Sequence, residues 1–257
     1  MIPQNDIVKW SIEHKWPTRE QVEQDLLLSQ AMCEISNDEI LKQELVLRGG
    51  TSFHKLFLPR PLRYSEDLDY VRVSGGGIGE IMKCLTALGG RLGYNVSTKM
   101  GVYPKVFWKS TAESGVPLKI KIEVNTFERS PSLPLITKHH EIDTAWCKTS
   151  AEIQVFQVEE LVATKIRALY QRSKGRDLFD FWLALDLLKL DPEKIIAAFE
   201  PYRPESISSA KLIRNLEVKL EDRSFLEDLN NLVASNDLGY DTYSAGRLVI
   251  EKILTRL

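Results

Sequence analysis

The sequence has little cysteine, no excess of charge of either sign and no long apolar run. Its 257 residues include only three cysteines, at positions 33, 84 and 147, and no CxxC pair. So sparse a set argues against a disulfide scaffold or a zinc finger and favours a reducing, cytoplasmic environment. No stretch approaches about 18 uninterrupted apolar residues, so no transmembrane helix and no membrane partner is expected. The opening residues also lack the basic and apolar regions of a signal peptide.

The charge balance excludes one class of function and leaves another open. Lys and Arg total 34 and Asp and Glu total 36, which gives a net charge of −2, and 43% of residues are hydrophobic. This composition is typical of a globular protein. A near-neutral chain does not coat nucleic acid by bulk charge, although a local basic groove remains compatible with it. The length allows one large domain or two modest ones.

The hydrophobic pattern predicts an α/β part over residues 1–150 and a helical part over residues 151–257. Thr18 and Gln21 form a capping box, which predicts the start of a helix. Strict alternation over residues 118–125 predicts a strand with one apolar and one polar face. Residues 130–150, with Pro131 and Pro134, are expected to be a linker or long loop. Further elements expected before residue 130 are strands at 45–47, 65–71, 96–98 and 105–109 and helices at 51–58 and 81–88.

Two acidic residues stand out beside a glycine turn. Asp67 and Asp69 are two apart on a predicted strand, so their side chains point to the same face. Two neighbouring carboxylates repel unless they are neutralised, and Mg²⁺ with oxygen ligands does this. The preceding Gly49-Gly50-Thr51 turn leads into a predicted helix, where free backbone N–H groups and a hydroxyl suit a phosphate. The alternative is a solvated acidic strand beside an ordinary turn.

Glu123 lies on the polar face of the alternating strand, in a row with Lys119 and Lys121. If this strand neighbours the one with Asp67 and Asp69, three carboxylates converge, which is enough to hold two metal ions. The alternative is an exposed glutamate in a cross-strand ion pair.

The segment 161–180 carries five basic residues, from Lys165 to Arg176, with no acid among them, and then two acids. Lys165 and neighbouring cations suit a triphosphate or a nucleic-acid backbone. Asp177 and Asp180 are three apart on the next predicted helix and share a face. The alternative is a solvated basic helix in which Asp177 serves as a helix cap. The adjacent pair His139-His140 is expected on the surface of a loop, not at a metal.

These motifs together resemble the AbiEii/AbiGii nucleotidyltransferase toxins of type IV toxin–antitoxin and abortive-infection systems, to which the MenT toxins are related. The resemblance covers about residues 45–185 and rests on four segments in the family's order. The segments are Leu47-Arg48-Gly49-Gly50-Thr51, Arg63-Tyr64-Ser65-Glu66-Asp67-Leu68-Asp69, Lys165-Ile166-Arg167-Ala168 and Gly175-Arg176-Asp177-Leu178-Phe179-Asp180.

The resemblance implies an α+β fold, with a polymerase-β-like nucleotidyltransferase core and mixed sheet followed by a helical domain. It implies that Asp67 and Asp69 bind metal, with Glu123 at the third acidic position, where Asp is commoner. It implies catalytic roles for Lys165 and Asp180. Nucleotide-binding roles then fall to Gly49, Gly50, Thr51, Ser65, Lys165, Arg167, Arg176 and Asp177. Thr51 stands where many members have Ser.

The implied reaction moves a nucleoside monophosphate from an NTP to an acceptor hydroxyl, with Mg²⁺ or Mn²⁺ as cofactor. The relatives suggest a tRNA 3′ end as acceptor and a helix-turn-helix antitoxin as partner. A metal-dependent nuclease is one alternative, but the Glu-x-Lys signature is missing because Val124 and Asn125 follow Glu123. A non-enzymatic binding module of the same fold is the other.

Overall fold

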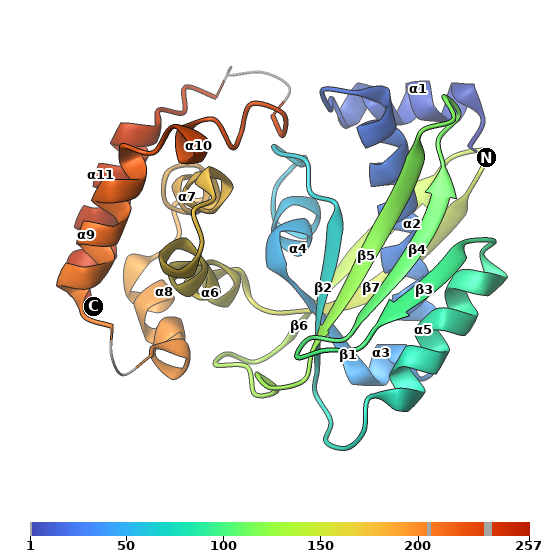
Figure 1. Ribbon diagram of the computed structural model, residues 1–257, viewed down its shortest axis with the longest axis horizontal. Helices are drawn as coiled ribbons and strands as arrows, with labels where there is room; N and C mark the ends of the chain where they lie inside the picture. The colour runs from blue at the N-terminus through green and yellow to red at the C-terminus, as the bar shows by residue number, and fades with distance from the viewer. Residues whose placement is uncertain (1, 205–206, 234–237) are drawn as a thin grey trace. The chain divides into compact units, whose positions relative to one another are not determined.

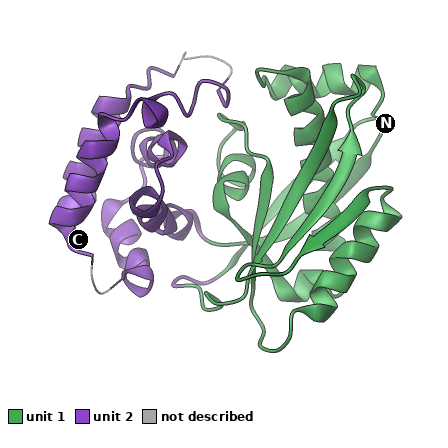
Figure 2. Ribbon diagram, viewed as in Figure 1, with its two compact units in different colours: residues 1–131, 135–156 green, residues 132–134, 157–257 purple. Residues whose placement is uncertain are grey.

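The computed structural model describes residues 2–204, 207–233 and 238–257, and it divides into two compact units (Figures 1 and 2). Unit 1 comprises residues 1–131 and 135–156, and unit 2 comprises residues 132–134 and 157–257. Among the described residues, every helix is too short or too polar to cross a bilayer.

Unit 1 is built on one mixed seven-stranded sheet, in the order β3-β4-β5-β2-β1-β7-β6. Its strands are β1 (Leu45–Arg48), β2 (Asp67–Arg72), β3 (Asn95–Lys99), β4 (Lys105–Thr111), β5 (Pro117–Asn125), β6 (Ile136–Asp143) and β7 (Lys148–Val155). Its helices are α1 (Gln4–Glu13), α2 (Arg19–Asn37), α3 (Leu41–Glu44), α4 (Gly49–Leu56) and α5 (Gly79–Arg91). The β2–β5 and β1–β7 pairs are parallel, and the other pairs are antiparallel. The α+β fold with a mixed sheet is therefore confirmed.

One face of the sheet packs into an apolar core. The inward residues of β4 and β5 alternate as predicted and are buried: Val106, Trp108, Leu118, Ile120, Ile122 and Val124. Trp108 donates its indole N–H to the Leu85 carbonyl of α5 at 3.1 Å. A Cβ on Gly89 would lie 2.4 Å from that indole nitrogen, so glycine is what allows α5 to approach the sheet. The predicted capping box is confirmed at the start of α2, with both Thr18–Gln21 hydrogen bonds formed.

The prediction of a linker over residues 130–150 is wrong, because β6 and the start of β7 occupy most of it. Edge strand β6 pairs only with β7 and alternates polar with half-buried residues, so it gives little hydrophobic signal. His139 and His140 therefore lie in a strand and not in a loop. His139 is on the surface as expected, where a hydrogen bond to Glu152 at 2.8 Å raises its pKa. Helix α1 was not predicted.

Unit 2 is helical. It contains α6 (Val158–Gln171), α7 (Gly175–Trp182), a π-helical turn (Leu183–Leu187), α8 (Pro192–Phe199), α9 (Ser209–Leu220), α10 (Arg223–Leu226) and α11 (Thr242–Lys252), with short 3₁₀ turns at Glu200–Tyr202 and Leu254–Arg256. Asp191-Pro192, which interrupts the helical pattern, opens α8: the Asp191 carboxylate accepts from the Glu193 N–H at 2.9 Å.

A buried carboxylate ties residues 132–134 to the helices of unit 2. Glu160 of α6 is fully buried and accepts from the backbone N–H groups of Ser132 at 2.6 Å and Leu133 at 2.9 Å. Tyr202 also donates its hydroxyl to Glu160. Because a buried charge is costly without partners, these donors explain why so short a segment is held to unit 2.

Candidate active site

The predicted carboxylates of unit 1 come together on the polar face of the sheet. Strand β2 runs parallel to β5, with Asp67 opposite Lys121 and Asp69 opposite Glu123. On the other side β2 pairs with β1, which places Arg48 opposite Asp69. The strand of Glu123 therefore lies beside the strand of Asp67 and Asp69, as convergence of the three carboxylates requires.

The glycine turn after β1 lies directly against Asp69. Gly49 has a φ of +86°, and a Cβ there would lie 2.5 Å from Asp69 Oδ2. Glycine is thus required both by the backbone conformation and by the close approach of the carboxylate. At Gly50, a Cβ would lie 2.5 Å from an Arg63 guanidinium nitrogen, so this glycine makes room for the Arg63 side chain.

The Thr51 hydroxyl holds the turn to β2. It is buried, donates to the Asp67 carbonyl at 2.6 Å and lies 2.9 Å from Ser65 Oγ. These contacts fix the start of α4 relative to the carboxylate strand.

The three carboxylates interact electrostatically with one another and with nearby lysines. Burial and the neighbouring charges of Asp67 and Glu123 raise the pKa of Asp69. Lys121 Nζ lies 2.6 Å from Asp67 and 3.9 Å from Glu123, and Lys105 Nζ lies 2.9 Å from Glu123. Burial alone would lower the pKa of Lys121, but the hydrogen bond from its ammonium to Asp67 and the surrounding carboxylates outweigh burial and raise it. Lys121 is therefore a charged counter-ion for this group.

The residues fit a divalent cation only in part. Among the described residues, no group of three His, Cys, Asp or Glu side chains is arranged to hold a metal ion. Asp67 and Asp69 form an oxygen pair whose mutual repulsion a bound cation would relieve. Glu123, by contrast, is neutralised by Lys105 and Lys121. Asp67 also lies 2.6 Å from Lys121, so a cation at the aspartate pair would compete with one lysine, whereas at Glu123 it would compete with two.

Unit 2 contains a second cluster, which is buried. Lys165 of α6 lies 2.6 Å from Asp180 and 3.7 Å from Asp177, both of α7. Arg172 donates two hydrogen bonds to Asp177, at 2.7 and 2.8 Å. Both aspartate side chains are fully buried and the Lys165 side chain is 7% exposed. Burial alone would raise the pKa of Asp177, but the Arg172 hydrogen bonds and the Lys165 charge outweigh it and lower that pKa.

This geometry is neither a solvated basic helix nor a helix capped by Asp177. Lys165 is a paired, nearly buried cation and not part of a solvated helix face. Asp177 lies in the first turn of α7 but binds Arg172, while the N-cap residue is Lys174. Arg176 is turned toward Asp228, to which its backbone N–H donates at 3.1 Å, and Arg167 is half-buried on α6.

Sequence reasoning missed two cations beside the unit 1 carboxylates, Arg48 and Lys105, and did not anticipate that Lys121 pairs with Asp67. The alternation of β5 already placed Lys121 on the same face as Glu123, so that residue was within reach. The positions of Arg48 and Lys105 follow only from strand pairing, which brings together residues far apart in the chain.

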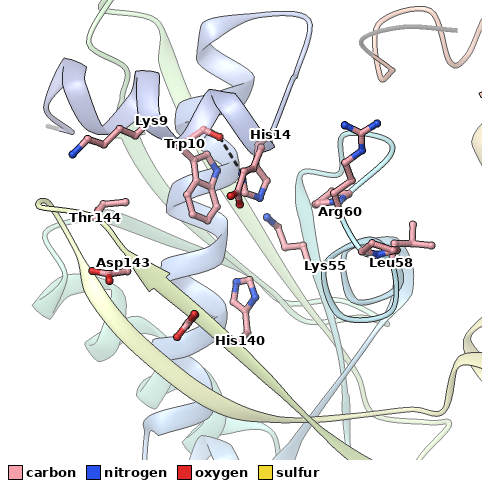
Figure 3. A pocket seen from close by; sticks show the side chains of 13 residues that line it. Lys9, Trp10, His14, Lys55, Leu58, Arg60, His140, Asp143 and Thr144 are labelled. Atoms are coloured by element: carbon pink, nitrogen blue, oxygen red, sulfur yellow. Dashed lines mark hydrogen bonds between the residues drawn. The ribbon is translucent and has the colours of Figure 1, made fainter. Parts of the chain in front are cut away.

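Unit 1 also has a separate pocket, of about 410 Å³, lined by residues other than the predicted site residues. Trp10 of α1 and His14, the residue after that helix, stack with their ring centres 3.9 Å apart on one side of it, and Lys55 and His140 also line it (Figure 3). Lys55 is already paired with buried Asp25 at 2.8 Å. Burial chiefly lowers the pKa of His140, to about 3, so its imidazole is neutral.

Comparison with known proteins agrees with the layout of the chain. Residues 30–234 match the family described as "Nucleotidyl transferase AbiEii toxin, Type IV TA system". The chain therefore belongs to the AbiEii family, and it is a nucleotidyltransferase. Members are toxins of type IV toxin–antitoxin systems, so the family implies an antitoxin partner and an NTP substrate. No curated protein sequence matches significantly.

Solved structures support the fold. The chain is similar to MenT4, the nucleotidyltransferase toxin Rv2826c from Mycobacterium tuberculosis H37Rv, with a TM-score of 0.67 and 17% identity over 100% of this chain and 91% of that one. It also matches an antigenic nucleotidyltransferase-like protein from Paracoccidioides brasiliensis, with a TM-score of 0.41 and 17% identity over 86% of this chain and 97% of that one. At such identity only the fold follows, and it follows from the first of these matches.

Proposed function

We propose that this nucleotidyltransferase is a Mg²⁺-dependent toxin that transfers a nucleoside monophosphate from an NTP to a hydroxyl at the 3′ end of a tRNA. The observation that carries the proposal is the Asp67–Asp69 pair, held against the Gly49 turn on the polar face of the sheet. The family supplies the reaction class, and the metal and the acceptor are our additions.

The aspartate pair is the part of the site that would hold the metal. Asp67 and Asp69 would ligate Mg²⁺, which when bound neutralises phosphate charge at the reacting phosphorus. Glu123 is a weaker candidate ligand because two lysines neutralise it. Mn²⁺ has the same preference for oxygen donors and would substitute.

The chain's own residues then bind and orient the nucleotide. The N-terminus of α4 at Gly49–Gly50 presents backbone N–H groups suited to phosphate, with Thr51 and Ser65 fixing the turn from behind. The acceptor hydroxyl releases its proton to water, its oxygen bonds to the α-phosphorus, the bond from that phosphorus to the β-phosphate oxygen breaks, and pyrophosphate leaves. Catalysis is positioning and charge neutralisation.

In unit 2, Lys165 is the cation that we assign to the nucleotide phosphates. Asp180 is fully buried against it and acts as a positioning residue, which orients the ammonium without touching substrate. Asp177 and Arg172 complete the support, and Arg167 and Arg176 are further candidates for phosphate contact.

The test is transfer of label from each of the four α-labelled NTPs to total tRNA, with and without Mg²⁺. We expect Mg²⁺-dependent labelling of tRNA from at least one nucleotide by the wild-type chain. Asp69→Asn should reduce it by about 10³-fold, whereas Asp143→Asn, which removes an exposed carboxylate on β6, should leave it unchanged. Failure with all four nucleotides in folded protein contradicts the proposal. So does Mg²⁺-dependent RNA cleavage without nucleotide, which instead indicates the nuclease alternative.

A further inference from the structure

Several lysines lie on the sheet of unit 1, next to the carboxylate site. The face of β3, β4 and β5 opposite the apolar core presents alternate residues of each strand. Five of these are lysines: Lys99, Lys105, Lys109, Lys119 and Lys121. Among the described residues of β2–β5 on this face, the acidic ones are the three site carboxylates alone, Asp67, Asp69 and Glu123.

Strand register makes this lysine face continuous with the site. One row across the sheet runs Lys99–Lys105–Glu123–Asp69–Arg48. Two of the five lysines, Lys105 and Lys121, neutralise site carboxylates at 2.9 and 2.6 Å. The other three are exposed and extend the positive charge away from the site.

Sheet stability does not account for this arrangement. Lys109 lies directly opposite Lys119, and Lys99 directly opposite Lys105. Like charges in directly opposed cross-strand positions are destabilising. A polyanion bound along this face would relieve both repulsions.

Aromatic rings accompany the lysines. Phe107 lies between the lysine rows, with Lys119 Nζ 5.6 Å from its ring centre. At the edge near Asn125, Tyr103 and Phe127 are 39% and 66% exposed and meet edge to face at 6.0 Å. Exposed rings beside cations are typical of nucleic-acid surfaces, where bases stack and phosphates bind lysine.

We infer that the lysine face binds the phosphate backbone of an RNA acceptor and leads its end to the aspartate pair, with a base stacked at Tyr103 and Phe127. The inference rests on the proposed function for its reaction, but the residues that it assigns lie outside the carboxylate site. The RNA phosphates bind Lys99, Lys109 and Lys119. Phe127 contacts a base, and this contact does not depend on charge.

The test compares two triple variants with the same change in charge. Lys99→Gln/Lys109→Gln/Lys119→Gln removes the exposed part of the lysine face. The control, Lys15→Gln/Lys42→Gln/Lys83→Gln, removes three exposed lysines elsewhere in unit 1, Lys83 being on α5 across the sheet. Binding of labelled tRNA is followed by fluorescence anisotropy over a series of salt concentrations, and NTP binding by calorimetry.

For the lysine-face variant, we expect RNA affinity to fall at least tenfold and NTP affinity to stay unchanged. The slope of log affinity against log salt should become shallower by about 2, because each phosphate contact with single-stranded nucleic acid contributes about 0.7. Phe127→Ala should weaken RNA binding with the slope unchanged. The control triple variant should match wild type in every measurement.

Wild-type RNA affinity in the lysine-face variant overturns the inference, and so does an equal loss in the control triple variant. If the lysine-face variant keeps RNA binding but loses binding to the antitoxin, the lysine face binds a protein partner and the inference is wrong. Failure of the proposed function gives a different result, namely a wild-type chain that transfers no nucleotide to RNA. Transfer that proceeds with unaltered RNA affinity in the variant overturns only the inference.

Discussion

The aspartates of the two units differ in how closely cations surround them and in the direction in which their pKa values are shifted. In unit 2, Asp177 and Asp180 are fully buried, and Arg172 and Lys165 pair with them at 2.6–2.8 Å. In unit 1, Asp67 and Asp69 lie side by side at the polar face, and Lys121 compensates Asp67 more directly than Asp69. Accordingly the pKa of Asp177 is lowered and that of Asp69 is raised.

The difference separates a cluster that organises structure from one that is incomplete without a ligand. In unit 2, the Arg172 hydrogen bonds and the Lys165 charge stabilise the ionised form of Asp177, so this carboxylate needs no further cation. In unit 1, Lys121 pairs with Asp67, but burial and the charges of Asp67 and Glu123 still raise the pKa of Asp69, and a further cation would relieve this repulsion. The comparison predicts that unit 1 substitutions act on activity and unit 2 substitutions act first on stability.

The largest expected effect is on activity, at Asp69. We expect Asp69→Asn to reduce nucleotidyl transfer by about 10³-fold, because charge stabilisation at the reacting phosphorus is lost. The melting temperature should stay equal or rise, since the substitution removes a repulsive charge. Initial rates and thermal unfolding measured on the same preparation test this. A clear fall in melting temperature with activity retained would reverse the comparison.

The next effect is on stability, at Asp180. Asp180→Ala leaves Lys165 buried without its nearest partner, and breaking a buried pair in this way costs about 3–5 kcal/mol. Denaturant unfolding measures the loss. Removing both charges, as Lys165→Met/Asp180→Leu, should recover much of the stability but not the activity. If Asp180→Ala had the same free energy of unfolding as wild type, the Lys165–Asp180 pair would not stabilise unit 2.

Gly49 gives a smaller effect that links the backbone to Asp69. Gly49→Ala adds a Cβ 2.5 Å from Asp69 Oδ2 at a φ of +86°. The control is Gly115→Ala, where φ is +85° and nothing lies within 4 Å of the added Cβ. We expect the control to lose only the backbone cost of about 1–2 kcal/mol. Gly49→Ala should lose more and also lose transfer activity. Equal stability and activity in the two variants would show that the close approach of Gly49 to Asp69 affects neither property.

The smallest effect is the pH dependence of stability, and it has opposite signs in the two units. The lowered pKa of Asp177 contributes stability that is present above the unfolded value near 3.8 and is lost as pH falls through the folded pKa. The raised pKa of Asp69 contributes stability that is present below the unfolded value near 3.8 and is lost as pH rises through the folded pKa.

Unfolding free energies from pH 3 to pH 7 distinguish these cases. The deficit of Asp177→Asn relative to wild type should shrink as the solution becomes acidic. Asp69→Asn should exceed wild type at pH 7, and that advantage should shrink toward pH 3. Adding Mg²⁺ at pH 7 should stabilise wild type and leave Asp69→Asn unchanged, because only the intact pair binds it. Parallel pH profiles for the two variants would show that the clusters do not differ.

Local patterns in the sequence predicted much of this molecule because the signals were physically strong. The Thr18–Gln21 box, the Gly49-Gly50 turn and the alternation of β5 each depend on residues a few positions apart. The family followed from four short motifs in order. Edge strand β6 was missed because it has no regular apolar face, and helix α1 because no side-chain cap marks its start after Pro3.

The candidate site divides in the same way. The spacing of Asp67 and Asp69 alone placed them on one face, and the motifs marked Lys165, Asp177 and Asp180. That Arg172 binds Asp177, and that Lys121 and Lys105 neutralise Asp67 and Glu123, did not follow from spacing. Whether a marked residue is solvated or buried was also beyond the sequence, as Lys165 illustrates.

By itself, then, the sequence determined which side chains share a strand face or a helix turn, since backbone periodicity alone fixes that. Only the tertiary structure decided which strands are neighbours. The parallel pairing of β2 with β5 set Asp69 opposite Glu123 and joined the carboxylates to the lysine face. Such pairing brings together residues more than fifty positions apart, and its register depends on the packing of the whole sheet against α2 and α5.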